Sequence, residues 1–93
     1  MICSFKDKQT EAIASGKNPK GFPPDIVRRA HRKLTMIEFA TSLDDLRSPP
    51  ANRLEALKGA RSGQHSIRIN DQWRICFRWT RAGAIDVEII DYH

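Results

Sequence analysis

Alternating apolar residues in the last third of the chain constrain its fold most strongly. Residues 73–80 (WRICFRWT) place a large apolar side chain at every second position, and residues 65–70 and 85–89 alternate in the same way with isoleucine and valine. Successive side chains of a β-strand point to opposite faces, so this pattern predicts strands that are buried on one face. Tight turns at 70–72 and 82–83 join them into an antiparallel meander.

A long amphipathic helix is predicted in the middle of the chain. It is expected to begin at Pro23 and Pro24, where a missing backbone N–H costs little, and to end near Thr41. A shorter helix is predicted over residues 7–15, ended by Gly16. The apolar residues of the long helix recur at three- and four-residue steps, the spacing of one helix face: Ile26, Val27, Ala30, Leu34, Ile37 and Ala40.

The remaining segments complete a small α+β domain. Residues 1–5 are predicted to form a short strand, residues 42–52 a helical turn, and residues 53–57 a short strand or an extended edge. The order of elements is then a strand, two helices and an antiparallel sheet of three or four strands, with the helices packed on one face of the sheet. A chain of 93 residues leaves little room for a second core, so residues 1–93 are predicted to form a single domain.

Positive charge is concentrated on the predicted sheet. Residues 53–81 contain seven basic and two acidic side chains, a local excess of +5, and the whole chain also has a formal net charge of +5. These charges alternate with the residues of buried strands, so they are held on a rigid surface rather than in a mobile tail. A fixed basic surface is typical of proteins that bind nucleic acid or another polyanion.

Membrane, secreted and metal-dependent classes of protein are not indicated. No apolar run approaches the ~20 residues of a membrane-spanning helix, and the first residues become charged without forming a signal segment. Cys3 and Cys76 belong to no CxxC or Cys/His pattern, so both are expected to be reduced, buried thiols of a cytosolic protein, with a single disulfide as the alternative. No carboxylate, Cys or His cluster has metal-ligand spacing, so no metal or other cofactor is expected.

Four segments resemble one known family. The runs LEALKG (54–59), HSIRIN (65–70) and QWRICFRW (72–79), with DYH (91–93), are similar to the HigB toxins of the RelE superfamily, and the resemblance covers nearly the whole chain. It implies a compact α+β fold similar to microbial ribonucleases. It also implies cleavage of messenger RNA in the ribosomal A site, and a helix-turn-helix antitoxin, similar to HigA, that restrains the toxin in a hetero-oligomer.

The same resemblance implies the residues of an active site. Carried over by position, these belong to the LKG and QWRI segments and to the C-terminal tail: Lys58, Arg74, Asp91, Tyr92 and His93. One position departs from the family pattern, because characterised members can carry a histidine in the LxxLKG segment where this chain has Glu55. Either Glu55 is the substitute base, provided that a lysine or arginine offsets its repulsion from phosphate, or the role of that histidine has moved to another residue.

RNA cleavage without a metal defines a role for each of these residues. The 2′-hydroxyl must lose a proton, the phosphorane must be stabilised, and the 5′-oxygen must be protonated as it leaves. We expect Arg74 to hold the scissile phosphate, because a guanidinium is permanently charged and can bind two phosphate oxygens. Lys58 would add positive charge, and His93 can act as acid or base because histidine titrates near neutral pH. Asp91 could orient His93 or share the proton transfer, and Tyr92 could stack on a base or donate a proton.

Other basic residues have less specific interpretations. Arginines in the basic stretch are expected to bind RNA or to be ordinary surface residues: Arg53, Arg61, Arg68 and Arg78. The second face of the long helix is either a solvated surface or a contact for ribosomal RNA or an acidic antitoxin segment: Arg28, Arg29, Arg32 and Lys33.

Rival readings follow from the same residues. Without the resemblance, Arg74 is a solvated strand residue, Lys58 and His93 are merely exposed, and Tyr92 packs beneath the sheet. A RelE-like module that binds RNA or an antitoxin without cutting is one rival function, and a ribosome-independent ribonuclease is another. A DNA-binding repressor is less favoured, because no helix-turn-helix spacing occurs and the basic residues lie mainly on the sheet.

Overall fold

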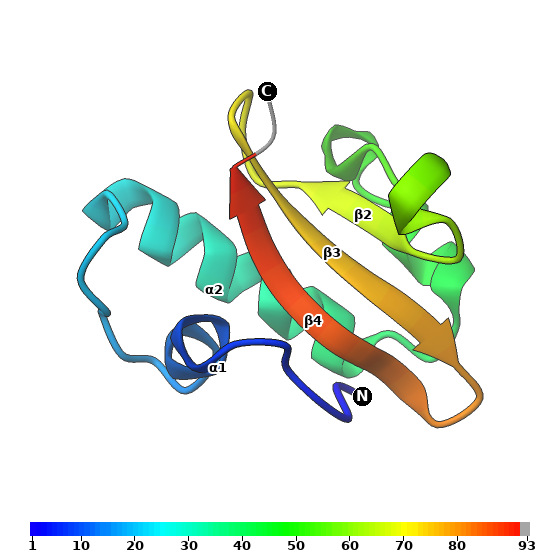
Figure 1. Cartoon of the computed structure of the whole chain (residues 1–93), viewed down its shortest axis with the longest axis horizontal. Coiled ribbons are helices and arrows are strands. Elements are labelled where there is room, and N and C mark those ends of the chain that lie inside the picture. The colour runs from blue at the N-terminus through cyan, green and yellow to red at the C-terminus, as the bar shows by residue number, and fades with distance from the viewer. Residues whose placement is uncertain (92–93) are drawn as a thin grey trace.

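The antiparallel sheet predicted from the alternating pattern is confirmed in the computed structural model, which describes residues 1–91. Its four strands follow one another in sequence order, and each is antiparallel to its neighbour (Figure 1). The first of them is the short edge strand predicted within residues 53–57. The strands are β1 (Glu55–Ala56), β2 (His65–Arg68), β3 (Trp73–Thr80) and β4 (Gly83–Asp91).

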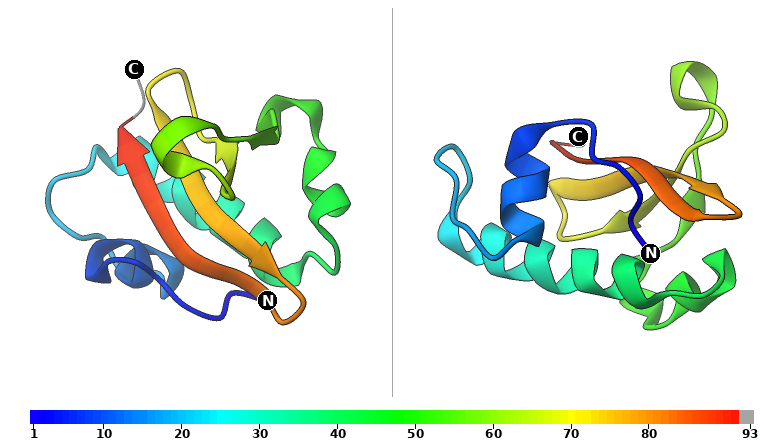
Figure 2. Two further views of the ribbon diagram at one scale, coloured as in Figure 1. Left: turned by 45° about the vertical axis from the view of Figure 1, so that its right-hand side comes forward. Right: turned by 90° about the horizontal axis from the view of Figure 1, so that it is seen from below.

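Two helices lie where the sequence predicts them. α1 spans Lys8–Ala14, and the Asp7 carboxylate caps it by accepting a 2.7 Å hydrogen bond from the backbone N–H of Thr10. α2 spans Pro24–Phe39 and ends slightly earlier than predicted. α2 runs beneath the sheet, whereas the loop between β1 and β2 rises on the opposite side (Figure 2). No helix within residues 1–91 is long and apolar enough to cross a membrane.

An apolar core fills the space between α2 and the sheet. Ile67 of β2 and Ile75 and Phe77 of β3 are fully buried there against the apolar face of α2. Trp73 and Trp79 are partly buried against the same core, which confirms their interpretation as packing residues. The alternation of β3 therefore assigns one face of the sheet to the core and leaves the other face for polar side chains.

The N-terminal segment is less regular than predicted. Residues 1–5 do not form a continuous strand, but make two isolated parallel bridges alongside β4, at Ile2 and Phe5. Gly83 permits this close approach, because a Cβ atom there would lie 2.1 Å from the carbonyl oxygen of Met1. The segment therefore extends the sheet at the β4 edge without adding a regular strand.

The two cysteines differ in burial. Cys76 of β3 is fully buried, as predicted, and this burial raises the pKa of its thiol. The predicted burial of Cys3 is wrong, because Ile2 and Phe5 take the inward positions of the irregular N-terminal segment and leave Cys3 exposed. Its Sγ donates to the carbonyl oxygen of Ala82 at 3.4 Å, and both cysteines are free thiols.

The segment that follows α2 is tied down by one buried amide. Asn52 is fully buried, and its Nδ2 donates to the carbonyl oxygens of Leu46 at 3.2 Å and Ser48 at 3.3 Å. These bonds fix the orientation of the whole side chain, including its Oδ1. The helical turn predicted over residues 42–52 is therefore a pair of short 3₁₀ helices, Leu43–Arg47 and Pro50–Asn52, held together by this amide.

Candidate active site on the open face of the sheet

The face of the sheet turned away from α2, here called the open face, carries the centre of the predicted site. The strand register pairs Glu55 with Ser66, Ser66 with Cys76, and Arg68 with Arg74. Directly opposite residues of antiparallel strands share a face, as do residues two apart on one strand. Glu55, Ser66 and Arg74 therefore lie on the same face of the sheet. The loop that joins β1 to β2 rises from the side of the sheet opposite α2 (Figure 2).

Arg74 is held in a fixed position on this face. Only 7% of the residue is exposed, so the reading of Arg74 as a solvated strand residue is wrong. Its Nε donates to Ser66 Oγ at 2.8 Å, and its Nη2 donates to the carbonyl oxygen of Arg53 at 2.7 Å and to that of Ser66 at 3.4 Å. The exposed Arg53 has a left-handed φ of 45° at the point where its carbonyl meets the guanidinium. These contacts set the plane of a permanent positive charge before any ligand arrives.

Glu55 places a carboxylate beside this guanidinium. Its Oε1 lies 3.9 Å from Nη2 of Arg74, and 51% of its side chain is exposed. The sequence argument required a nearby cation to offset the repulsion between this carboxylate and a phosphate. Arg74 meets that condition, and the half-exposed carboxylate remains accessible to a ligand on the open face.

The other predicted catalytic residues lie at the ends of β1 and β4. Lys58 follows β1, is exposed, and precedes the short 3₁₀ helix Gly59–Arg61. Asp91 ends β4 one position beyond the partner of Arg74, and its Oδ2 accepts a 3.0 Å hydrogen bond from Gln72 Nε2. Tyr92 and His93 lie outside the described residues.

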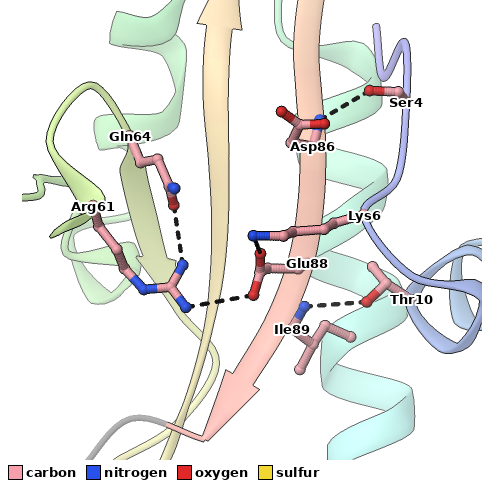
Figure 3. Close-up of polar contacts among 8 residues, drawn as sticks. All are labelled: Ser4, Lys6, Thr10, Arg61, Gln64, Asp86, Glu88 and Ile89. Atoms are coloured by element: carbon pink, nitrogen blue, oxygen red, sulfur yellow. Dashed lines mark hydrogen bonds and ion pairs between the residues drawn. The ribbon is translucent and has the colours of Figure 1, made fainter.

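Arg61 is neutralised by a carboxylate on β4 (Figure 3). Its Nη2 lies 3.5 Å from Glu88 Oε1, and its Nη1 donates to Gln64 Oε1 at 3.1 Å. Lys6 lies 3.2 Å from the second carboxylate oxygen of Glu88, whose side chain is 13% exposed. Two cations thus share one largely buried carboxylate, and this network ties the β1–β2 loop and the N-terminal segment to β4.

Arg78 and Arg68, which were grouped as RNA-binding candidates, lie in different surroundings. Arg78 packs against Gly63 in the β1–β2 loop, where a Cβ atom would be 2.6 Å from Arg78 Nη1. Arg68 pairs with Asp71 in the turn after β2 and lines a hollow beside α2. Arg68 is opposite Arg74 in the register, but at the uncovered end of β2 it also lines this hollow, so the predicted RNA-binding set extends from the open face to the β2 edge beside α2.

Two partners in this arrangement were missed by the sequence argument. Ser66 is fully buried and orients Arg74, and Glu88 neutralises Arg61. A signal existed for Ser66, because the alternation of residues 65–70 puts it on the face opposite Ile67. Glu88 had no comparable signal, since its partner is 27 residues away. Within residues 1–91, no three His, Cys, Asp or Glu side chains are grouped so that they could hold a metal ion.

Fold and site together define a small basic α+β protein in which a fixed guanidinium stands beside an accessible carboxylate. A model of the family described as "RelE-like toxin of type II toxin-antitoxin system HigB" matches residues 3–93. The chain belongs to this family, which confirms the resemblance read from the sequence. Membership of a toxin–antitoxin family implies an antitoxin partner.

Two curated relatives are similar over most of the chain. "Toxin HigB-1" of Vibrio cholerae serotype O1 is 38% identical over 87 residues, which cover 92% of this chain and 92% of the relative. "Endoribonuclease HigB" of Proteus vulgaris is 33% identical over 93 residues, which cover 100% of both chains. The second relative is named for the cleavage of RNA.

Proposed function

We propose that the chain is the endoribonuclease of its toxin–antitoxin module, and that it cuts messenger RNA in the ribosomal A site and so stops translation. The observation that carries this proposal is the fixed Arg74 guanidinium beside the accessible Glu55 carboxylate, with Nη2 and Oε1 3.9 Å apart. Family membership and the name of the Proteus vulgaris relative support RNA as the substrate.

The proposed reaction uses the 2′-hydroxyl of the RNA as its nucleophile. The 2′-oxygen attacks the adjacent phosphorus, and the bond from phosphorus to the 5′-oxygen breaks. Glu55 takes the proton of the 2′-hydroxyl, and His93 donates a proton to the leaving 5′-oxygen. The products are a 2′,3′-cyclic phosphate and a free 5′-hydroxyl, so each transferred proton has a donor and an acceptor.

Charge stabilisation is assigned to Arg74 and Lys58. Attack on the phosphate increases its negative charge, and a cation held in place beforehand stabilises that charge without reorganising. The hydrogen bonds from Arg74 to Ser66 Oγ and to the Arg53 carbonyl supply this preorganisation. Lys58 is exposed in the loop that follows β1, the strand that carries Glu55, and we assign its charge to the same phosphate.

The C-terminal residues complete the proposed site. Asp91 orients His93, and its carboxylate is already positioned by the hydrogen bond from Gln72 at 3.0 Å. Tyr92 stacks on a base of the messenger, a common mode of RNA recognition. The roles of Tyr92 and His93 rest on the family resemblance of the terminal DYH.

The ribosome and an antitoxin are the proposed partners. A short chain with few catalytic groups gains most when another body aligns its substrate, because positioning can supply a large part of the barrier reduction. The ribosome would hold the messenger in this way. A helix-turn-helix antitoxin similar to HigA would bind the toxin in the bacterial cytoplasm.

The test is messenger cleavage by the purified protein, with and without programmed ribosomes, followed by analysis of the new RNA ends. We expect cutting on ribosomes only, ends that carry a 2′,3′-cyclic phosphate, and a loss of at least ~10²-fold in Arg74→Ala. Arg47→Ala is the matched control, because Arg47 is an exposed arginine that pairs with Asp44. It should cut at the wild-type rate.

Folding of the Arg74→Ala variant must be checked separately. Removal of the guanidinium leaves the buried Ser66 hydroxyl without its donor, which costs roughly 1–3 kcal/mol. Circular dichroism melting shows whether the variant is folded at the assay temperature. Wild-type cutting by folded Arg74→Ala would overturn the site.

The remaining outcomes separate the rival functions. Equal cutting of free RNA would keep the nuclease and remove the ribosome requirement. No cutting by folded wild-type protein would favour a module that binds without cutting. Glu55→His would then show whether the histidine found in other family members restores activity.

A further inference from the structure

A second basic region, here called the α2 hollow, lies beside α2 at the uncovered edge of β2. Its volume is about 360 Å³, and it opens between α2, the 3₁₀ helix Pro50–Asn52 and the end of β2. The edge of β2 is uncovered here, because β1 pairs only with His65 and Ser66. Four cationic side chains line the hollow: Arg29, Arg32, Lys33 and Arg68.

The cations of the α2 hollow face one another with little compensation. None of the lining residues is acidic in the part of the chain that the structure describes. Asp71 pairs with Arg68, but its side chain is 98% exposed, and such a surface pair contributes only about 0–1 kcal/mol. Partial burial, and then the charges of Arg32, Arg29 and Arg68, lower the pKa of Lys33 from its ordinary value.

Lys33 is nevertheless held firmly in the α2 hollow. Its Nζ donates to Oδ1 of Asn52, the buried amide whose Nδ2 is bound by the carbonyls of Leu46 and Ser48. The ammonium is therefore positioned by a neutral group that leaves its charge uncompensated. A cation that is fixed in this way is preorganised for an incoming anion.

We propose that the α2 hollow is a binding site for the phosphodiester backbone of RNA, separate from the Glu55–Arg74 pair. An arginine guanidinium can donate two parallel hydrogen bonds to two oxygens of one phosphate, and a lysine ammonium adds a localised positive charge. The rest of the hollow is lined by four residues with apolar side chains, which do not compete with RNA for the cations: Met36, Pro49, Ala51 and Ile69. Contacts of this kind bind a strand without reading its sequence.

A polyanionic strand fits the α2 hollow better than an acidic protein segment does. RNA brings a phosphate at every nucleotide, so neighbouring phosphates can meet several of the four cations together. A peptide brings single carboxylates on flexible side chains, which must lose conformational freedom to reach the same cations. The inference deepens the proposed function and rests on RNA as the ligand, but it does not depend on cleavage.

The experiment compares two adjacent arginines of α2. Arg29 lines the α2 hollow, whereas Arg28 lines the adjoining groove between α1 and α2, which shares only Arg32 and Met36 with the hollow; both arginines are exposed. The full chain is titrated against a labelled single-stranded 2′-O-methyl RNA, which lacks the hydroxyl needed for cleavage. Binding is followed by fluorescence anisotropy over a range of salt concentrations, and melting by circular dichroism checks that each variant is folded.

Arg29→Gln should weaken RNA binding severalfold, up to about tenfold, and lower the salt-dependence slope by about 0.7, the loss of one phosphate contact. Arg28→Gln removes the same charge from the next residue and should leave both quantities close to wild type. Equal losses in the two variants would show that only overall charge matters, and would overturn the site. No loss in Arg29→Gln, either with the oligonucleotide or with vacant ribosomes, would overturn it as well.

Two further arms identify the source of the phosphate and test the competing partner. Sedimentation with vacant ribosomes tests ribosomal RNA as the ligand, and the free oligonucleotide tests a messenger strand. A loss of binding in Arg29→Gln but not in Arg28→Gln, in either assay, supports the site and identifies which RNA supplies the phosphates. Calorimetric titration with the antitoxin tests a protein partner. A loss of antitoxin binding with unchanged RNA binding would replace RNA by the antitoxin as occupant.

This inference and the proposed function can fail independently. A chain that binds RNA through the α2 hollow but cuts no messenger would keep the site and lose the ribonuclease. A chain that cuts on ribosomes, while Arg29→Gln binds RNA as wild type does, would keep the ribonuclease and lose the site.

Discussion

Positive charges on the open face and in the α2 hollow have opposite kinds of surroundings. On the open face, Arg74 is bonded to Ser66 and to a backbone carbonyl beside Glu55, and Arg61 lies against Glu88. In the α2 hollow, the cations lie near one another without an acidic lining residue, as far as the structure describes the chain. Carboxylates lie beside the cations of the open face, whereas the α2 hollow has no acidic lining residue and leaves most of its positive charge available.

This contrast indicates a division of work between the two regions. Internal partners make a guanidinium precise in position, which suits a group that must meet a reacting phosphate. Uncompensated cations cost stability through mutual repulsion, but they attract a polyanion over a longer distance. The open face is therefore suited to chemistry, and the α2 hollow to holding RNA.

The largest expected effect is loss of cleavage when the proposed base is removed from the open face. Glu55→Gln keeps the size of the side chain and removes its basicity, so the cleavage rate on programmed ribosomes should fall about 10²–10⁴-fold. RNA binding should not weaken, because no cation is lost. Glu55→His should retain activity, with the base-dependent limb of its pH–rate profile moved toward neutral pH. Wild-type cutting by Glu55→Gln would remove Glu55 from the mechanism.

A pair of glycine substitutions tests whether the β1–β2 loop supports the open face through Arg78. Gly63 and Gly21 have similar left-handed φ values of 91° and 101°, but only at Gly63 would a Cβ atom meet Arg78 Nη1. Both alanine variants should lose about 1–2 kcal/mol of unfolding free energy through backbone strain, measured by urea unfolding. Gly63→Ala alone should also weaken RNA binding, because it displaces Arg78. Equal RNA binding by the two variants would contradict a role for Arg78.

A smaller gain is expected when the surface pair at the edge of the α2 hollow is released. Asp71→Asn frees Arg68 from its carboxylate and should strengthen RNA binding by about two- to fivefold in the anisotropy assay. Asp44→Asn is the matched control, because it releases Arg47 from an exposed pair with the same sequence spacing outside the hollow. A similar gain in both variants would show that the stronger RNA binding comes from the change in net charge and not from the release of Arg68.

The smallest expected effect is on the pH dependence of stability. The folded chain has a lowered Lys33 pKa, whereas the unfolded chain has the ordinary value. At a pH between these two pKa values, the unfolded chain binds more protons than the folded chain does. The contribution of Lys33 to the unfolding free energy therefore rises with pH in this range. Urea unfolding of wild type and Lys33→Met should therefore differ by more at alkaline pH than at neutral pH, in addition to a constant loss of the bond to Asn52. A difference that does not change with pH would contradict the lowered pKa of Lys33, which partial burial and then the neighbouring cations produce.

The sequence predicted the elements best where the signal is local. β3 spans Trp73–Thr80, the same residues as its alternating pattern, because strand periodicity depends on neighbours along the chain. The positions of Lys58 and Arg74 came from short motifs, and Glu55 was identified as the departure from the family. The exposure of Cys3 was missed, because it depends on how an irregular segment meets β4.

Contacts between distant segments could not be predicted in this way. Arg74 is fixed by Ser66 and by the Arg53 carbonyl, which are 8 and 21 residues away, so its burial follows from the register of three strands. Helical periodicity placed Arg28 and Arg29 on one basic face, but the elements packed beside α2 put them in different surroundings. The α2 hollow could not be predicted from the sequence, because it depends on the packing of α2 against a later segment, where Lys33 bonds to Asn52, 19 residues away.

The most direct test of this division of work is steady-state cleavage on programmed ribosomes by two variants, one from each region. Glu55→Gln should lower kcat and leave KM nearly unchanged, because it removes a group that acts in the transition state. Arg29→Gln should raise KM and leave kcat nearly unchanged, because it removes a contact that holds RNA before and during reaction. The same change in both parameters for both variants would contradict the assignment of chemistry to the open face and of binding to the α2 hollow.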